Sequence, residues 1–156
     1  MRFIAISDIH GRRGNLFDII EKHIDDANYF LCLGDCNSGD DFDDAVAYFG
    51  NRLHLITVCG NTDFRSTEPA TREFTLAGKK ILLCHGHTFN VKYSKSPLEN
   101  EAKRRNVDIA FFGHTHTPYC EVKDGIYFIN PGAVANGNYG IVDIKDNEIK
   151  CEHCKI

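Results

Sequence analysis

The stretch that decides the fold is residues 3–11, which read FIAISDIHG. Its first four residues are apolar without interruption, and a short continuous apolar run is typical of a strand that is buried on both faces. The run ends at Ser7, and the polar residues Asp8 and His10 follow at once, with Gly11 allowing a tight turn. The stretch therefore predicts a buried strand that delivers polar side chains from its carboxyl end.

The same pattern recurs in four further apolar runs, at residues 29–33, 53–59, 81–84 and 107–112. Each run stops at a short polar motif, and in order these are Gly34-Asp35, Gly60-Asn61, His85-Gly86-His87 and Gly113-His114-Thr115-His116. Ligands of open α/β sheets bind in the crevice outside the carboxyl ends of the strands. We therefore expect the polar side chains of all five motifs to gather at one edge of a sheet.

Helix starts separate these runs. We interpret Asn15 as the N-cap of a helix that follows the first motif. Ser96 and Glu99 have the spacing of a capping box, with a proline between them at the first helical position, and this helix is expected to end near Asn106.

A further helix is predicted at residues 40–49, where Phe42, Val46 and Phe49 would share one apolar face. After residue 118 the helical patterns stop, and we expect strands joined by hairpin turns at residues 120–123, 126–130, 139–144 and 148–153. The fold class that follows is α/β (α+β), with two packed sheets flanked by helices.

The composition excludes several classes of protein. A chain of 156 residues fits one domain, residues 1–156, and 42% hydrophobic with 26% charged residues excludes disorder. A net charge of −4 makes nucleic acid or an anionic membrane an unexpected partner. No apolar run approaches the ~20 residues of a membrane helix. Seven cysteines are an odd number, so we expect a reduced, cytoplasmic protein rather than a disulfide framework.

The polar residues at the strand ends form a candidate metal site. Seven of them are candidate ligands: Asp8, His10, Asp35, Asn61, His85, His114 and His116. Such a set of oxygen and nitrogen donors suits Mn, Fe, Co, Ni or Zn. Seven ligands are too many for one tetrahedral ion and suit two ions that share a bridging group. We expect Asp35 to be the bridge, because the two oxygens of a carboxylate can serve two cations.

Each motif also has a simpler explanation. A single histidine at a strand end is commonly a surface residue, and Gly-Asp or Gly-Asn pairs are ordinary turn chemistry. The joint placement favours the metal site, since five of the eight histidines lie in these motifs.

In their order, the five motifs resemble those of the calcineurin-like metallophosphoesterases. The resemblance runs from residue 1 to about residue 135 and includes Asn130-Pro131-Gly132, which is similar to a motif of the small bacterial and archaeal phosphodiesterases. It implies a four-layer α-β-β-α sandwich. It also implies a first metal held by Asp8, His10, Asp35 and His116, and a second held by Asp35, Asn61, His85 and His114.

The activity implied by this resemblance is that of a dinuclear metal-dependent phosphoesterase, above all a phosphodiesterase. It would hydrolyse a small phosphorylated substrate by attack of a metal-bridging hydroxide, with manganese as the expected metal. The alternative is a scaffold that binds partner proteins, similar to the retromer subunit of the same family. The presence of all seven ligands favours the enzyme.

One position departs from the family pattern. Many members carry a histidine after the asparagine of the third motif, where it is thought to protonate the leaving group, and here that position is Thr62. A threonine hydroxyl is not an acid near neutral pH. His87 is a candidate for the missing acid, and a water molecule is the alternative. Asp63 is a candidate positioning residue, although an acid that ends a turn also explains it.

Overall fold

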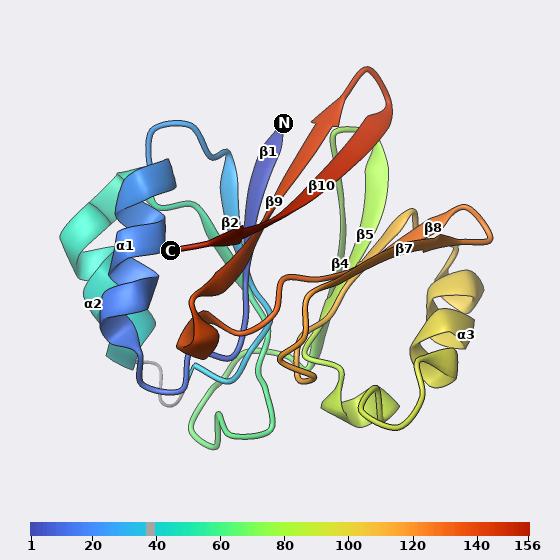
Figure 1. The fold of residues 1–156 in the computed structure, drawn as a ribbon, viewed down its shortest axis with the longest axis horizontal. Coiled ribbons are helices and arrows are strands. Elements are labelled where there is room, and N and C mark those ends of the chain that lie inside the picture. Colours follow the sequence, from blue (N-terminus) through green and yellow to red (C-terminus); the bar gives the residue numbers. More distant parts are fainter. Residues whose placement is uncertain (37–39) are drawn as a thin grey trace.

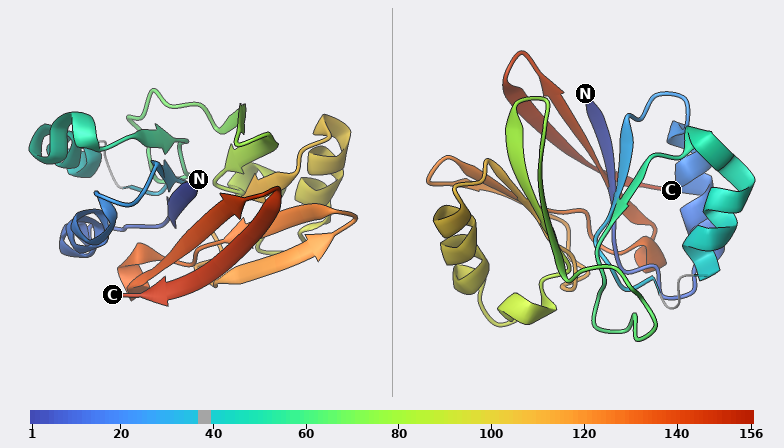
Figure 2. Two further views of the ribbon diagram at one scale, coloured as in Figure 1. Left: turned by 90° about the horizontal axis from the view of Figure 1, so that it is seen from above. Right: turned by 180° about the vertical axis from the view of Figure 1, so that it is seen from behind.

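The chain folds into four layers in the order α-β-β-α, as predicted (Figure 1). The structure is a computed structural model that describes residues 1–36 and 40–156, and the side chains of residues 40 and 41 lie outside the described part. Helices α1 (Arg13–His23) and α2 (Asp40–Phe49) cover the outer face of one sheet, and α3 (Ser96–Arg105) covers the outer face of the other. Figure 2 shows the two sheets face to face between these helices.

The first sheet has five strands in the order β10, β9, β1, β2, β3. Their bounds are β1 (Arg2–Ile6), β2 (Tyr29–Cys32), β3 (Leu55–Thr57), β9 (Asn138–Lys145) and β10 (Glu148–Lys155). Strands β1, β2 and β3 are parallel, whereas β9 is antiparallel to both β1 and β10. The sheet is therefore mixed.

The second sheet also has five strands, in the order β4, β5, β6, β8, β7. Their bounds are β4 (Thr71–Leu76), β5 (Lys79–Cys84), β6 (Ile109–Phe111), β7 (Tyr119–Lys123) and β8 (Ile126–Asn130). Strands β5, β6 and β8 are parallel, and the two outer strands are antiparallel to their neighbours. Short 3-10 turns at Gly50–Arg52, His87–Phe89 and Val134–Asn136 complete the elements.

The central strand β1 explains why its sequence is apolar without alternation. Phe3 and Ala5 pack between the two sheets, whereas Ile4 and Ile6 pack beneath α1 and α2. All four side chains are fully buried. Burying an isoleucine or phenylalanine side chain contributes about 1.5–3 kcal/mol, so both faces of this strand hold the layers together.

The parallel strands place their carboxyl ends at one edge of the sandwich. Strands β1, β2 and β3 of the first sheet and β5 and β6 of the second end at the lower edge in Figure 1. The five polar motifs follow these strands directly, so the topology brings them together as the sequence predicted.

Two predicted helix caps are wrong, although α3 has its proline in the first turn and ends at Asn106 as predicted. Helix α1 begins at Arg13 with Arg12 at the N-cap, three residues earlier than predicted, and the Asn15 side chain donates a hydrogen bond of 2.9 Å to the Val134 carbonyl instead of capping the helix. In α3, Ser96 is already inside the helix and no side chain caps it. The carboxylate expected to complete the capping box, that of Glu99, binds Lys123 on β7 instead. In both cases the polar group binds a residue far along the chain instead of the helix end.

The burial predictions need two corrections. Val46 is 46% exposed, and Ala45 occupies the buried face of α2 in its place. The third apolar run forms only the short strand β3, which is half-buried because it has a neighbour on one side alone. The other strands match the prediction to within about two residues, except β4, which was not predicted. In the described part of the chain, no helix is long and apolar enough to cross a lipid bilayer.

Candidate metal centre

The seven predicted ligands meet at the shared strand edge in two groups. Asp8, His10 and His116 form the first group, and Asp35, His85 and His114 form the second, with the ligand atoms of each group within 4.8 Å of one another. Asn61 adjoins the second group, because its Oδ1 atom lies 3.1 Å from Nε2 of His85. These residues come from loops after five different strands, which only the tertiary fold brings together.

The first group has the spacing expected around one cation. Nε2 of His116 lies 3.0 Å from Oδ1 of Asp8 and 3.2 Å from Nε2 of His10. The third separation, between Nε2 of His10 and Oδ1 of Asp8, is 3.7 Å. Ligand atoms that bind one ion at about 2.0–2.2 Å stand roughly 3–3.6 Å apart, so only small adjustments are needed.

The second group is equally compact. Nε2 of His85 lies 3.1 Å from Nδ1 of His114 and 3.4 Å from Oδ2 of Asp35. Three donors thus converge on one point from loops of both sheets.

Asp35 lies between the two groups. Its Oδ2 atom, 3.4 Å from Nε2 of His85, is also 3.9 Å from Nε2 of His10 in the first group. Its other oxygen, Oδ1, accepts a hydrogen bond of 2.9 Å from the backbone N–H of Thr62. One oxygen is therefore held by the protein while the other faces both candidate metal positions.

Asp8 shows the same division between its two oxygens. Oδ2 accepts hydrogen bonds from the Ser7 hydroxyl (2.6 Å) and from the backbone N–H of His114 (3.0 Å). Oδ1 is buried and accepts no hydrogen bond within the described part of the chain. An unsatisfied buried carboxylate oxygen is costly, and it points here into a ring of imidazole nitrogens. These residues fit a bound divalent cation.

A backbone carbonyl orients His85. Nδ1 of this ring lies 2.7 Å from the Leu33 carbonyl oxygen, which can only accept, so Nδ1 carries the proton in the neutral ring. Nε2 then presents its lone pair to the second group. Such a second hydrogen bond is the usual way in which a protein fixes a metal-binding imidazole.

The centre carries buried negative charge. Asp8 is fully buried and Asp35 is only 2% exposed. Burial by itself raises the pKa of Asp35, but the interaction with His85 and the hydrogen bond from Thr62 outweigh it and hold the pKa well below its usual value. The Asp35 carboxylate is therefore ionised although it is buried, and buried charges persist only when opposite charges compensate them.

The environment of the centre shifts the pKa values of His85 and His114 in opposite directions. Burial opposes protonation of His85, but Asp35 and Asp8 raise its pKa above the ordinary value. Burial, together with the charge of His85, lowers the pKa of His114 to about 4. The neutral His114 ring therefore keeps a lone pair available near neutral pH.

Five of the seven candidate ligands have a left-handed backbone, which non-glycine residues rarely adopt. The positive φ angles belong to Asp8 (55°), His10 (45°), Asp35 (56°), His114 (67°) and His116 (60°). Each such residue costs of order 1–3 kcal/mol, and such residues cluster at functional sites, where the surrounding structure holds them in place. The left-handed backbone turns the side chains of these residues toward the candidate metal centre.

Two glycines allow the loops to approach this closely. A Cβ atom on Gly60 would lie 2.1 Å from Oδ1 of Asp35, and one on Gly113 would lie 1.9 Å from the Ser7 hydroxyl oxygen. Both distances are far below van der Waals contact, so no other residue fits without moving a candidate ligand or its support.

Asp63 binds the backbone of the ligand loops. Its carboxylate accepts hydrogen bonds from the backbone N–H groups of Asp35 (2.8 Å), Cys36 (2.8 Å) and Gly60 (2.7 Å). The residue thus ties the loop after β2 to the loop after β3.

His87 lies next to the second group. Its ring centroid is 5.4 Å from that of His85 and 6.2 Å from that of His114. Burial lowers its pKa, and its Nδ1 atom is buried without a hydrogen-bond partner in the described part of the chain.

Sequence reasoning missed the residues that support the ligands. Ser7 carries no signal beyond its place next to Asp8, and the Leu33 carbonyl is a backbone group that no motif reveals. The asparagine of the Asn130-Pro131-Gly132 motif was noticed only by resemblance. Its side chain donates to the Gly113 carbonyl (2.8 Å) and to the Thr115 hydroxyl (3.1 Å), and so it braces the loop of the fifth motif.

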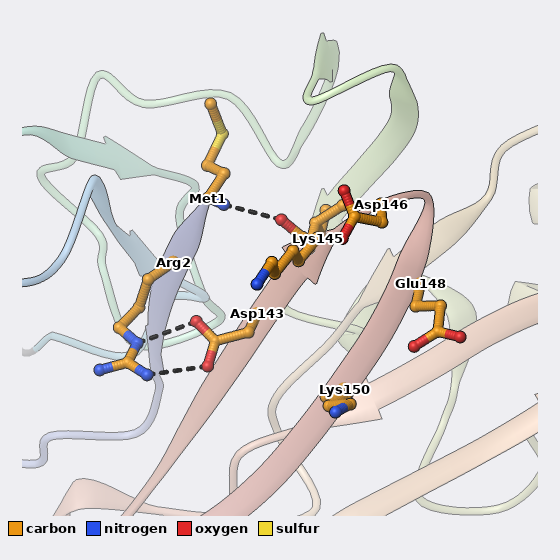
Figure 3. A pocket seen from close by; sticks show the side chains of 8 residues that line it. Met1, Arg2, Asp143, Lys145, Asp146, Glu148 and Lys150 are labelled. Atoms are coloured by element: carbon orange, nitrogen blue, oxygen red, sulfur yellow. Dashed lines mark hydrogen bonds and ion pairs between the residues drawn. The ribbon is translucent and has the colours of Figure 1, made fainter.

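A separate cavity of about 520 Å³ lies at the opposite end of β1, between Met1 and the β9–β10 hairpin (Figure 3). The Met1 ammonium group donates to the Ile144 carbonyl (2.7 Å), and Arg2 donates twice to Asp143 (2.8 and 2.9 Å). Arg2 and Asp143 thus form an ion pair at its wall, and the cavity shares no residue with the metal centre.

Comparison with known proteins agrees with this fold and site. Residues 1–147 match the family model of the calcineurin-like phosphoesterase superfamily domain, and the chain belongs to this family. It is 28% identical to the probable metallophosphoesterase YsnB of Bacillus subtilis, over 86% of this chain and 75% of that protein. It is 29% identical to the phosphodiesterase YfcE of Escherichia coli K12, over 96% of this chain and 89% of that protein.

Solved structures share the fold. A predicted phosphoesterase from Streptococcus pneumoniae superposes with a TM-score of 0.84 at 22% identity, over 99% of this chain and 88% of that one. Vps29 of Entamoeba histolytica, solved in complex with Zn²⁺, superposes with a TM-score of 0.78 at 20% identity, over 99% of each chain.

Proposed function

We propose that this protein is a phosphodiesterase that uses two divalent metal ions. The observation that carries the proposal is the position of Asp35, whose Oδ2 atom faces both groups of candidate ligands. Both ions would share Asp35. Asp8, His10 and His116 would complete the first set of ligands, and Asn61, His85 and His114 would complete the second. Family membership and a relative named as a phosphodiesterase support the reaction class.

The bound ions would supply the Lewis acidity that activates a water molecule and polarises the phosphoryl oxygens. The protein's own contribution is preorganisation. Ser7 and the His114 backbone N–H hold Asp8, while the Thr62 N–H holds Asp35, so neither carboxylate has to reorganise when substrate arrives.

Two side chains would assist without binding metal. Asp63 would act as a positioning residue, because it holds the backbone of Asp35 and of Gly60. His87 would donate a proton to the leaving group, because it adjoins the second group of ligands and Thr62 has no acidic proton to give. Burial lowers the pKa of His87, so this donation would be strongest at acidic pH, where the ring is protonated.

Manganese is the metal that we propose, with Ni, Fe, Co or Zn as substitutes, because the donors are imidazole nitrogens and carboxylate or amide oxygens. The substrate would be a small phosphorylated molecule. Its selection would depend on the loops that border the centre, residues 62–73 and 88–97. A reducing compartment, the cytoplasm, suits a protein whose seven cysteines are all thiols.

The test begins with protein stripped of metal by a chelator. Bis-p-nitrophenyl phosphate and p-nitrophenyl phosphate are then assayed with Mn²⁺, Ni²⁺, Zn²⁺ or Mg²⁺ added back. We expect hydrolysis that returns with Mn²⁺, that is faster for the diester, and that is lost in Asp35→Asn. Turnover that survives chelation, or that Asp35→Asn leaves intact, would contradict the proposal.

The second candidate function is a protein-binding scaffold. Phe64 and Tyr93 favour it, because these side chains are 90% and 92% exposed in the loops that follow Asn61 and His85. Exposed apolar side chains that gather into one patch are typical of interaction surfaces. A folded protein that binds two metal ions and hydrolyses neither ester with any metal would favour the scaffold over the enzyme.

A further inference from the structure

Two buried thiols lie in contact beside the metal centre. Cys32 is the last residue of β2, and Cys36 follows four residues later, directly after Asp35. Their Sγ atoms are 2.9 Å apart, and the residues are 0% and 6% exposed. A disulfide has an S–S distance of about 2.05 Å, so roughly 0.9 Å of approach separates this pair from a covalent bond.

Burial alone does not explain this contact. Cys84 is also fully buried, and its thiol is directed at the Phe111 carbonyl oxygen, 3.5 Å away, as an ordinary weak donor. Cys32 and Cys36 are instead directed at each other across the turn that carries Asp35.

The peptide between Asp35 and Cys36 is tied into the metal centre from both sides. Its residues donate their backbone N–H groups to the Asp63 carboxylate, each over 2.8 Å. The Asp35 carbonyl in turn accepts from the backbone N–H of Ile9 (3.0 Å) and of His10 (3.4 Å). Movement of Cys36 toward Cys32 therefore pulls on the loops of the first three motifs together.

We propose that Cys32 and Cys36 form a reversible disulfide that displaces Asp35. The co-reactant is a small hydroperoxide such as hydrogen peroxide, because a bulkier disulfide reagent cannot reach sulfur atoms this deeply buried. The sulfur of Cys36, the more exposed of the two, attacks one peroxide oxygen, the O–O bond breaks, and a sulfenic acid and one water form. The sulfur of Cys32 then displaces the hydroxyl, which forms the S–S bond and releases a second water. Two thiols and one peroxide thus give one disulfide and two waters.

The consequence for the metal centre rests on the proposed function. Asp35 is already in a left-handed conformation with φ 56°, and its Oδ2 atom faces both candidate metal positions. A shift of its backbone misplaces that oxygen for both ions at once. The oxidised protein therefore binds Mn²⁺ more weakly, and reduction restores the binding.

The covalent step is tested by peptide mapping of the full-length protein. Reduced, metal-free protein is treated with hydrogen peroxide, unfolded in urea with N-ethylmaleimide present so that buried free thiols are alkylated, and digested with trypsin. The peptide of residues 23–52 contains Cys32 and Cys36 and no other cysteine, and that of residues 106–123 contains Cys120 alone. We expect the first peptide to lose two hydrogens and to escape alkylation at both sulfurs. A fully alkylated 23–52 peptide, at a peroxide dose that oxidises Cys120, would overturn the proposal.

The displacement of Asp35 is tested by hydrogen exchange. The amide protons of Asp35 and Cys36 are protected by the Asp63 carboxylate, so we expect both to exchange at least tenfold faster in the oxidised protein and to recover after reduction. Cys36→Ser should be insensitive to peroxide in this measurement, and Cys36→Ala is the second variant if the serine disturbs the buried site. Cys120→Ser should respond as the wild type does. Unchanged exchange in a protein shown to carry the disulfide would contradict the coupling.

Titration calorimetry with Mn²⁺ tests whether oxidation weakens metal binding. We expect the dissociation constant to rise about tenfold or more on oxidation, as for changes that misplace a ligand. If the reduced protein binds no Mn²⁺, the proposed function fails, whereas the peptide map and the exchange rates still decide whether the disulfide forms and moves Asp35.

Discussion

The carboxylate of Asp63 accepts a hydrogen bond of 2.8 Å from the backbone N–H of Asp35, so one acidic residue fixes the loop that carries another. A second bond, from the N–H of Gly60, joins the same carboxylate to the neighbouring ligand loop. The geometry of the candidate metal centre therefore depends on a residue that binds backbone rather than metal.

The first prediction concerns this support. In Asp63→Asn, an amide NH₂ replaces one acceptor oxygen and faces backbone donors that it cannot satisfy. We expect Mn²⁺ affinity, measured by calorimetry, to fall roughly 10–100-fold. Asp146→Asn removes the same charge from the exposed turn between β9 and β10 and should leave the affinity unchanged. Equal affinities for the two variants would show that Asp63 does not position the site.

The close approach of Gly60 to Asp35 gives a second prediction. The added methyl group of Gly60→Ala would meet Oδ1 of Asp35 at 2.1 Å, so the loops must separate. We expect a loss of about 1–3 kcal/mol in the free energy of unfolding, together with weaker metal binding. Gly14→Ala is the matched control, since a Cβ there meets nothing within 4 Å and the site is helical. That variant should be as stable as the wild type or more so, as chemical denaturation can show.

A third prediction concerns the Ser7 hydroxyl, which binds only one of the two carboxylate oxygens of Asp8. Ser7→Ala removes the hydroxyl that donates 2.6 Å to Oδ2 and leaves Oδ1 in place. The carboxylate then gains freedom to rotate, and we expect Mn²⁺ affinity to fall about tenfold with little change in the protein's circular dichroism. Ser94→Ala, which removes a hydroxyl from an exposed loop, serves as the control. Full affinity in Ser7→Ala would mean that the His114 N–H alone orients Asp8.

The role proposed for His87 predicts a dependence on the leaving group. Phenolate needs a proton more than p-nitrophenolate does, and general acid catalysis contributes typically 10²–10⁴-fold. We expect His87→Gln to slow hydrolysis of a phenyl diester about 100-fold and that of the p-nitrophenyl diester only slightly. His54→Gln changes an exposed histidine away from the centre and should affect neither ester. An equal loss for both esters would assign His87 a structural role and leave proton donation to water.

The strand ends could be predicted from the sequence because burial imposes a simple pattern. Continuous apolar runs are required where both faces of a strand are covered, and the side chains that follow them must lie at the sheet edge. Asp8, Asp35 and His85 were therefore found without the structure.

Other features depend on tertiary contacts that no local pattern encodes. Strand β4 has few apolar residues because it is an edge strand without a fully buried side chain. Asn15 and Glu99 were assigned to helix caps, but Val134 and Lys123, which lie far along the chain, bind them. The left-handed conformation of Asp8 is equally invisible, because ordinary sequence rules assign it to glycine or asparagine.

The central claim is that two metal ions share Asp35, and metal stoichiometry tests it most directly. Metal-free protein is equilibrated with Mn²⁺, and bound manganese per chain is measured by mass spectrometry of the metal, for the wild type and for Asp35→Asn. We predict two ions per wild-type chain, with both affinities weakened in the variant, since its amide lacks the charge to bridge two cations. A single ion in the wild type, or two ions bound with unchanged affinity in Asp35→Asn, would contradict the account.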